Sequence, residues 1–290
     1  MVIVVVGPTS VGKTKLSIEI AKKINGEIIN ADSMQFYRKL DVGTAKVTKK
    51  EMENIPHHLF DILDVDSDYS IFDYQIDCRK VINDILKRGK TPILVGGTGL
   101  YIKAALYDYN LNYEKENNDY DNLSTEELYN MLIYLDKDID IDKNNRRRLI
   151  RAINYYKENN TSINNNKTDK LLYDTLFIGL TCERSILYDR INRRVDKMFE
   201  VGLEQEVRYF YEKNVYSKPL INGIGYKELY KYFSGEISLD DAKELIKRNS
   251  RRYAKRQYTF FNNQMSIRWW NVNFSDFDKT VEDVLNYINK

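Results

Sequence analysis

The N-terminal segment Val2–Thr14, with the sequence VIVVVGPTSVGKT, indicates the class of fold. Five consecutive branched aliphatic residues predict a strand over Val2–Val6 that is buried on both faces. The loop Gly7–Thr14 fits the pattern GxxxxGK[ST], and the apolar period that follows it predicts a helix over Lys13–Ile24. A strand, a glycine-containing loop and a helix in this order are typical of a phosphate-binding P-loop, because backbone N–H groups and a helix N-terminus converge on the anion.

The individual residues of this loop predict different parts of the site. Lys13 supplies a mobile cation, and the Thr14 hydroxyl can ligate Mg²⁺. We expect the main chain of the preceding residues to hold phosphate oxygens; these are Gly7, Pro8, Thr9, Ser10, Val11 and Gly12. The motif does not say which phosphate compound binds.

Strands and helices alternate along the chain beyond this loop. Aliphatic runs predict strands at Glu27–Asn30, Pro92–Val95 and Thr175–Leu180, and helical periods lie at Phe72–Lys87 and Leu100–Leu106. The last third predicts helices at Glu183–Tyr211, broken near Gly202, and at Tyr226–Phe233 and Leu239–Asn262. This order predicts an α/β protein with a parallel, P-loop NTPase-like sheet core and a helical C-terminal part.

The middle of the chain has a different pattern. It is rich in Asn and Asp, has no strand run, and predicts helices at Thr125–Leu135, with a Ser124/Glu127 capping box, and at Asn145–Lys157. The polar run Asn159–Asn166 predicts a flexible loop. We therefore expect a core over 1–106, a helical insertion domain over 107–173, and a return to the core with C-terminal helices over 174–290.

Composition excludes several classes of protein. The 290 residues carry 45 Lys and Arg against 43 Asp and Glu, and 42% are hydrophobic, which fits a globular chain of one or two domains. No apolar run approaches the ~20 residues of a membrane span, and no signal peptide is expected at the N-terminus. Cys78 and Cys182 form no CxxC motif. We expect a cytoplasmic monomer without disulfide, zinc site or membrane partner.

Two sequences near predicted strand ends are further candidates for chemistry. Asp32 follows the second strand, where a carboxylate beside a P-loop could accept a proton or bind Mg²⁺; the alternative is a helix N-cap. After the third strand, Gly96-Gly97-Thr98-Gly99 stands where P-loop NTPases usually have a strand-ending Asp. A glycine-rich turn there predicts a second anion cradle. Two cradles suit a diphosphate and weaken the ATPase and GTPase hypotheses.

Basic residues cluster although the net charge is only +2. Four arginines lie within 146–151, and six basic residues without an acid lie within 247–256. In a helix, Arg248, Arg251, Arg252 and Lys255 share one face, which predicts contacts to nucleic-acid phosphates; the alternatives are a solvated face or packing on the core. Arg190, Arg193 and Arg194 could cap bound phosphates. His57 and His58 complete no metal-ligand spacing, so we expect a structural or substrate-shaping role for them.

Taken together, the motifs resemble the bacterial isopentenyl-pyrophosphate tRNA transferases, or tRNA dimethylallyltransferases, from Met1 to about Phe261. The resemblance is carried, in order, by GPTSVGKT (7–14), ADSMQFYRKLDVGTAK (31–46), PHHLFD (56–61), GGTGLY (96–101), RRRLIRA (146–152), DRINRRVDKMFEVGLEQEV (189–207), GIGYKEL (223–229) and AKRQYTFF (254–261). The combination of a P-loop with DSMQxYR and GGTGLY makes it specific.

The resemblance implies a reaction and a set of residues. Dimethylallyl diphosphate would bind the P-loop, and N6 of the adenosine 3′-adjacent to the anticodon, tRNA position 37, would attack the allylic carbon. Asp32 would accept the amine proton, Thr98 would contact the reacting centre, and Lys13 with Thr14-bound Mg²⁺ would stabilise the leaving diphosphate. The insertion would clasp the anticodon stem-loop. The residues implied in tRNA contact are Asp32, Ser33, Met34, Gln35, Arg147, Arg148, Leu149, Ile150 and Arg151; the basic face adds Arg251 and Arg252.

The sequence departs from the family pattern at three positions, and its core is compatible with two other activities. Val47 stands in place of the Pro of TAKP, Asn222 in place of a Gln or Arg, and Phe260 in place of a Trp. The core alone is compatible with a P-loop kinase of a small metabolite or nucleotide, with Asp32 as base. It is also compatible with an isopentenyltransferase that acts on free adenylate, although the arginines of 147–151 argue against this.

Overall fold

A six-stranded parallel sheet forms the centre of the described chain. The computed structural model describes residues 1–108, 120–166 and 170–289. Within these residues the strand order is β3-β2-β4-β1-β5-β6, and every pairing is parallel. The strands are β1 (Val2–Val6), β2 (Gly26–Asn30), β3 (His57–His58), β4 (Thr91–Val95), β5 (Thr175–Thr181) and β6 (Arg268–Asn271).

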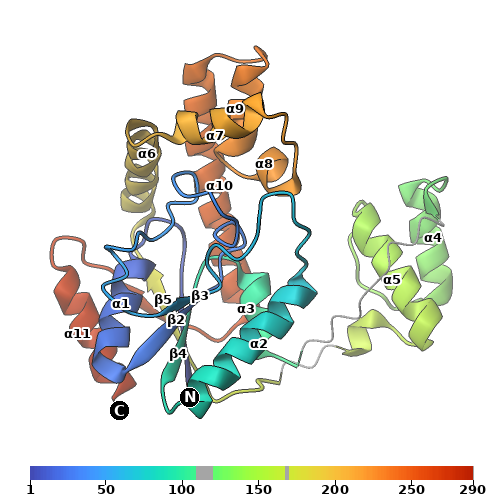
Figure 1. Ribbon diagram of the computed structural model, residues 1–290. Helices are drawn as coiled ribbons and strands as arrows, with labels where there is room; N and C mark the ends of the chain where they lie inside the picture. The colour runs from blue at the N-terminus through green and yellow to red at the C-terminus, as the bar shows by residue number, and fades with distance from the viewer. Residues whose placement is uncertain (109–119, 167–169, 290) are drawn as a thin grey trace. The chain divides into compact units, whose positions relative to one another are not determined.

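Helices cover both faces of this sheet. Helix α1 (Lys13–Ile24) packs with α11 (Phe277–Ile288) on one side, and α2 (Ile71–Lys87) lies with α3 (Gly99–Leu106) on the other (Figure 1). Strand β1 is therefore fully buried, as its unbroken aliphatic run predicts. The predicted α/β class and parallel core are confirmed.

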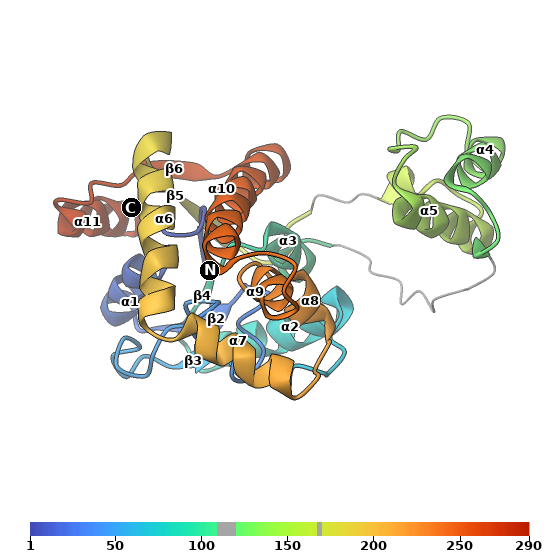
Figure 2. The same cartoon turned by 90° about the horizontal axis from the view of Figure 1, so that it is seen from above.

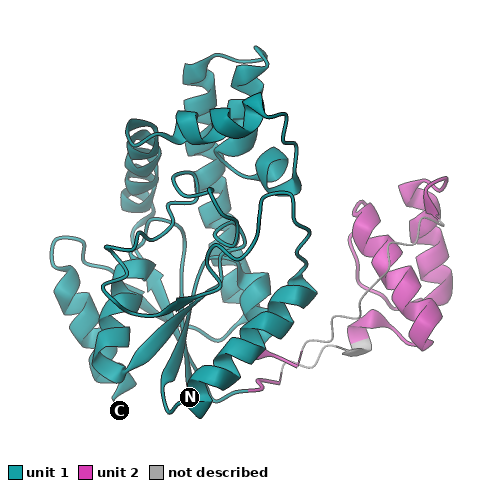
Figure 3. Cartoon of the chain, in the orientation of Figure 1, with its two compact units in different colours: residues 1–105, 173–290 teal, residues 106–172 magenta. Residues whose placement is uncertain are grey.

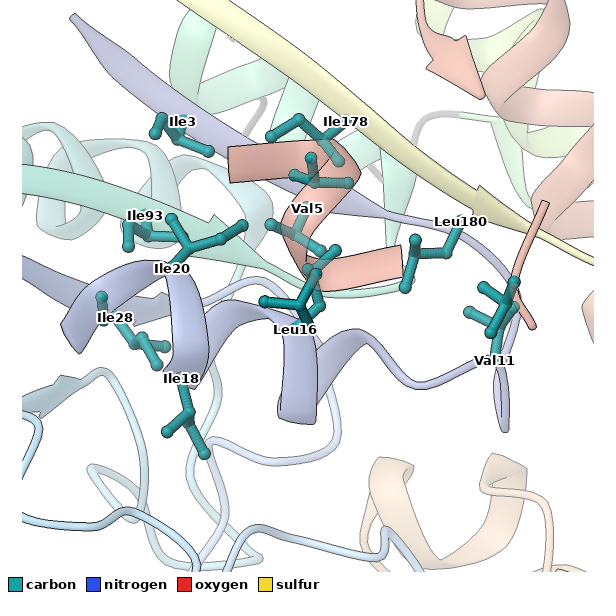
Figure 4. Packing of buried hydrophobic residues seen from close by; sticks show 14 residues of the cluster. Ile3, Val5, Val11, Leu16, Ile18, Ile20, Ile28, Ile93, Ile178 and Leu180 are labelled. Carbon is teal, nitrogen blue, oxygen red and sulfur yellow. The ribbon is translucent and has the colours of Figure 1, made fainter. Parts of the chain in front are cut away.

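The main hydrophobic core lies between the sheet and helix α1. Ile3 and Val5 of β1 pack with Leu16 and Ile20 of α1, and all four side chains are completely buried (Figure 4). Burying an aliphatic side chain of this size contributes roughly 1.5–3 kcal/mol. This packing holds the loop between β1 and α1 in place.

The last third of the chain builds a helical layer beyond the strand ends. It contains α6 (Arg184–Glu200), α7 (Leu203–Glu212), α8 (Lys218–Asn222), α9 (Tyr226–Phe233) and the long α10 (Leu239–Gln264) (Figure 2). The break predicted near Gly202 separates α6 from α7. Helix α10 packs against α6 and α9 and runs from this helical layer toward the sheet (Figure 1).

Residues 106–172 form a second compact unit, and residues 1–105 with 173–290 form the first (Figure 3). In the second unit, α4 (Thr125–Leu135) and α5 (Arg146–Asn159) pack through Leu128, Leu132 and Leu149, which are fully buried. The capping box predicted at Ser124 is present. The segment Ile163–Asn166 is a 3₁₀ helix, which corrects the predicted loop.

Two strands and two α-helices were not predicted from the sequence. Strand β3 has only two residues, and β6, with the sequence RWWN, has polar ends typical of an edge strand. Neither has the aliphatic run that identified the inner strands. Helices α8 and α11 were also missed. The C-terminal part is therefore not wholly helical, because β6 adds a strand to the sheet beside β5.

No helix within 1–108, 120–166 and 170–289 is long and apolar enough to span a membrane.

Candidate active site

A cavity of about 630 Å³ lies where β1, β2 and β4 end, and every residue in its wall belongs to the first unit. Parallel α/β sheets usually bind ligands at this edge. The P-loop, Asp32 and Ser33 form one wall, and the loop around Thr44 forms another. Arginines of α6 and residues of α8, α9 and α10 complete it; the latter include Asn222, Tyr226, Ser250, Tyr253, Arg256 and Gln257.

The P-loop has the backbone of an anion site. Gly12 has a φ of +104° and caps the N-terminus of α1, a conformation that other residues rarely adopt. The first N–H groups of a helix have no acceptor within the helix, so those of α1 can serve a ligand. The buried Ser10 Oγ has no hydrogen-bond partner among the described residues. Both features suit phosphate oxygens.

Lys13 lies inside the loop. Its Nζ donates to Gly7 O at 3.1 Å and to Pro8 O at 2.8 Å. Burial lowers the pKa of this ammonium from 10.5 to about 8; the Asp32 carboxylate partly offsets the effect, and the Arg194 guanidinium adds to it. Burial also lowers the pKa of Arg194. Both cations have therefore lost part of their hydration, and the charge of an incoming anion would compensate for this loss.

The affinity of this cavity for diphosphate is expected to fall as the pH rises above about 8. In the free protein Lys13 loses its proton near this pH, whereas the bound anion keeps Lys13 charged. Linkage then requires a decrease of about tenfold per pH unit. Calorimetric titration from pH 7 to 9.5 measures it. In Lys13→Arg the guanidinium stays charged, so its profile should be flat; a flat wild-type profile would contradict the prediction.

Asp32 lines the cavity directly after β2. Its main-chain N–H donates to Asn30 Oδ1 at 2.8 Å, and its Oδ1 accepts the N–H of Met34 at 3.1 Å. A turn rather than a helix follows, so the alternative that Asp32 is a helix N-cap is wrong. The carboxylate lies close enough to Lys13 and Arg194 to influence the pKa of each.

The glycine-rich turn after β4 is used mainly for close packing. The N–H of Gly96 donates to Val5 O at 3.3 Å, and that of Thr98 donates to Ala31 O at 3.2 Å. The predicted second anion cradle is therefore wrong for these two groups. At Gly97, a Cβ atom would collide with the Gln257 side-chain amide, so only glycine allows this approach.

Gln257 of α10 joins the turn to the P-loop. Its Oε1 accepts the N–H of Thr9 at 3.0 Å, and its Nε2 donates to Gly97 O at 3.0 Å. The side chain is almost fully buried. Sequence analysis missed this role, although Gln257 lies in the AKRQ motif that carried part of the resemblance.

Thr98 lies beside the cavity wall. Its Oγ1 accepts the N–H of Ser33 at 3.2 Å, which fixes the residue next to Asp32. Direct contact between Thr98 and a reacting group stays a prediction. Tyr253 of α10 interacts with Thr98, Gln257 and Asp32, and burial, the largest cause, raises its pKa to about 12. Tyr253 also lines the cavity.

A carboxylate of α7 fixes the loop around Thr44, which forms the second wall of the cavity. Glu206 accepts the main-chain N–H groups of Asp41, Val42 and Gly43 at 2.7–3.0 Å and the hydroxyl of Tyr226 at 2.7 Å. The adjoining Thr44 O accepts from Gln35 Nε2 and Arg194 Nη2. Glu206 was also missed, since a Glu within a helix gives no signal that three N–H groups of a distant loop converge on it.

The three arginines of α6 separate into two groups. Arg190 and Arg194 line the cavity, as expected of residues that cap a phosphate. Arg193 is 79% exposed and pairs with Asp189 at 3.0 Å, so the expectation is wrong for this residue.

The basic face of α10 is also divided. Arg248, Arg252 and Lys255 are exposed, but Arg251 Nη1 donates to Asn192 Oδ1 of α6 at 2.6 Å. Lys247 pairs with Asp196 at 2.8 Å. Arg252 is thus available to a polyanion, whereas Arg251 is partly engaged in packing α10 on α6.

In the second unit, Arg147 and Arg148 of α5 are exposed. Leu149 is fully buried and Ile150 packs on the same core, so the expectation of nucleic-acid contact through the Leu149 side chain is corrected. Arg151 is half-buried. Arg146, the fourth arginine of the cluster, donates to the main-chain carbonyls of Tyr120 and Leu123. It therefore links α5 to the segment that precedes α4.

The two histidines point to different partners. His58 Nε2 lies 2.7 Å from Glu27, which also pairs with Arg88 and Lys90. His57 lines the cavity, packs edge-on against Phe60, and has its pKa lowered by burial. No group of three or more His, Cys, Asp or Glu in the described chain could hold a metal ion.

Comparison with known proteins identifies the family. The family model described as IPP transferase matches residues 35–264, and one described as isopentenyl transferase matches residues 1–66. The chain belongs to the IPP transferase family. Its resemblance to the isopentenyl-pyrophosphate tRNA transferases is thereby confirmed.

Curated relatives in this family share nearly half of their residues with the chain. The tRNA dimethylallyltransferase of Bacillus cytotoxicus is 48% identical over 99% of this chain and 94% of its own length. The enzyme of the same name from Macrococcus caseolyticus is also 48% identical, over 97% and 94%.

Solved structures in the IPP transferase family have the same fold. The tRNA isopentenylpyrophosphate transferase of Bacillus halodurans superposes with a TM-score of 0.79 at 41% identity, over 99% of this chain and 95% of that one. A eukaryotic dimethylallyltransferase acting on tRNA gives a TM-score of 0.86 at 31% identity, over 98% and 77%.

Proposed function

We infer that this IPP transferase moves a dimethylallyl group from dimethylallyl diphosphate to a tRNA. The acceptor is N6 of the adenosine 3′-adjacent to the anticodon, and diphosphate is released. The observation that carries the inference is the presence of the P-loop and Asp32 in the wall of one cavity. A cation-lined loop suits the diphosphate, and a carboxylate in the same cavity supports a role as acceptor of the amine proton.

The reaction forms a bond between N6 and the allylic carbon and breaks the bond between that carbon and the diphosphate oxygen. Asp32 takes the proton that N6 loses. Lys13 and Arg194, both desolvated, face the negative charge that grows on the leaving group. The adenine has to leave its stack to reach the cavity, as in other enzymes that modify bases.

We propose that Mg²⁺ binds with the diphosphate. Thr14 is exposed and lines the cavity, and Mg²⁺ commonly takes one or two protein oxygens together with phosphate oxygens and waters. Such an ion would add positive charge at the leaving group. Thr14→Ala is expected to weaken diphosphate affinity and its dependence on Mg²⁺ together, in titrations with and without the ion. An unchanged response to Mg²⁺ would exclude Thr14 as a ligand.

The tRNA contacts are proposed for exposed arginines, namely Arg147 and Arg148 of α5 and Arg252 of α10. Arg252→Ala should reduce the slope of log K against log salt for tRNA binding by about one unit. Arg251→Ala should change the slope less, because Arg251 is bonded to Asn192. Neither should alter the affinity for dimethylallyl diphosphate. An unchanged slope in Arg252→Ala would remove this residue from the tRNA site.

One assay tests the proposed function. The protein is incubated with radiolabelled dimethylallyl diphosphate and unmodified tRNA, and in parallel with the same donor and free adenylate. A third reaction contains labelled ATP and nucleosides. Label is expected in tRNA alone. Label in adenylate or in a phosphorylated nucleoside would instead support one of the two other activities.

A further inference from the structure

The chain that follows β6 returns to the P-loop. The N–H of Val272 donates to Thr181 O at 2.8 Å, and the N–H of Asn273 donates to Thr280 Oγ1 at 3.3 Å. The first bond attaches the segment to the end of β5, and the second links the start of the segment to α11. The segment lies after residue 264, where the matched IPP transferase model ends.

Phe277 backs the P-loop at its last glycine. A Cβ atom on Gly12 would lie 2.7 Å from Cε2 of Phe277, so the ring rests directly against this residue. Lys15 Nζ lies 4.8 Å from the centre of the same ring and pairs with Asp278 at 3.2 Å. The start of α11 is thereby attached to the start of α1.

Phe274 lies under Arg190. The guanidinium carbon of Arg190 is 3.8 Å from the centre of the Phe274 ring, and its Nε donates to Ser10 O at 3.0 Å. No described carboxylate pairs with Arg190, and no described residue accepts from its two Nη groups. With Nε used on the P-loop, these groups are left for the oxygens of an anion in the cavity that Arg190 lines.

We propose that Phe274 is a positioning residue for diphosphate binding, which it supports by fixing Arg190 over the P-loop. Arginine loses much rotamer freedom when it binds a ligand, and a stacked ring removes part of this freedom beforehand. The proposal rests on the proposed function for the identity of the donor, dimethylallyl diphosphate. It does not depend on the acceptor, because the diphosphate of any prenyl donor would meet the same guanidinium.

The competing explanation is that Phe274 only fills the core. Its ring does pack partly against the cluster that contains Val5 and Leu16. Loss of packing would reduce stability and leave diphosphate affinity unchanged, or would reduce affinity whether or not Arg190 is present. The two explanations therefore differ in whether the effect of Phe274 requires Arg190.

A double-mutant cycle tests this dependence. The affinity of the full chain for inorganic diphosphate is measured by calorimetry at one pH for wild type, Phe274→Leu, Arg190→Met and the double variant. Phe274→Leu keeps an apolar side chain and removes the ring. The matched control is Trp270→Leu, because Trp270 packs on the same core and stacks with Arg268 at 5.2 Å, outside the cavity wall. Urea unfolding reports the stability of each variant.

Phe274→Leu is expected to weaken diphosphate binding by about 3- to 30-fold, and Phe274→Tyr to retain the wild-type affinity. In the Arg190→Met background, Phe274→Leu should have no further effect, and Trp270→Leu should change stability without changing affinity. An unchanged affinity in Phe274→Leu, or an equal loss with and without Arg190, would overturn the proposal. If wild type binds diphosphate but does not prenylate tRNA, the proposed function fails separately.

Discussion

Replacement of Asp32 by asparagine is expected to lower kcat by about 10²–10⁴, the usual range for loss of a general base. The amide keeps an oxygen that can accept the N–H of Met34, so the turn after β2 is retained. At a pH where Lys13 stays charged, the KM for dimethylallyl diphosphate should change little, because the P-loop is intact. Single-turnover prenylation, with the enzyme in excess over tRNA and the donor saturating, measures the chemical step.

A second measurement on the same variant checks the electrostatics. The Asp32 carboxylate raises the pKa of Lys13, so its removal should lower that pKa below about 8. The decrease in donor affinity with rising pH should then begin at a lower pH than in wild type. Turnover within a few-fold of wild type would show that Asp32 only holds the turn.

Replacement of Gln257 by leucine is expected to lower the free energy of unfolding by about 2–4 kcal/mol. The substitution leaves the half-buried N–H of Thr9 and the buried carbonyl of Gly97 without their partner, and an unsatisfied buried group costs about 1–3 kcal/mol. Diphosphate affinity should fall as well, because Thr9 belongs to the P-loop. Urea unfolding and calorimetric titration measure the two effects.

Gln264 is the matched control for Gln257. It lies on the same helix, is exposed, and accepts from Lys103 Nζ at 2.9 Å. Gln264→Leu should change stability by less than about 1 kcal/mol and leave diphosphate affinity unaltered. Equal effects of the two substitutions would show that the bridge from α10 to the P-loop contributes nothing specific.

The inner strands of the sheet and the phosphate loop could be predicted from local sequence patterns alone. An unbroken aliphatic run followed by GxxxxGKT is a strong local signal for a strand, a loop and a helix. The predicted bounds of β1 and α1 therefore agree with those in the structure. Helix α4 was predicted because its Ser124/Glu127 capping box is also a local pattern. Asp32 could be placed at the site because the carboxyl ends of parallel strands meet at one edge of a sheet.

The distant side chains that complete this site could be identified only from the packing of the folded chain. Gln257 is bonded to residues 248 and 160 positions away, and Glu206 to a loop about 163 positions away. Helical periodicity assigned Arg251 and Arg252 to one face, but only the packing of α10 on α6 separates the bonded from the exposed arginine. Contacts of this kind depend on how elements pack, and a local pattern of residue types carries no information about the partner.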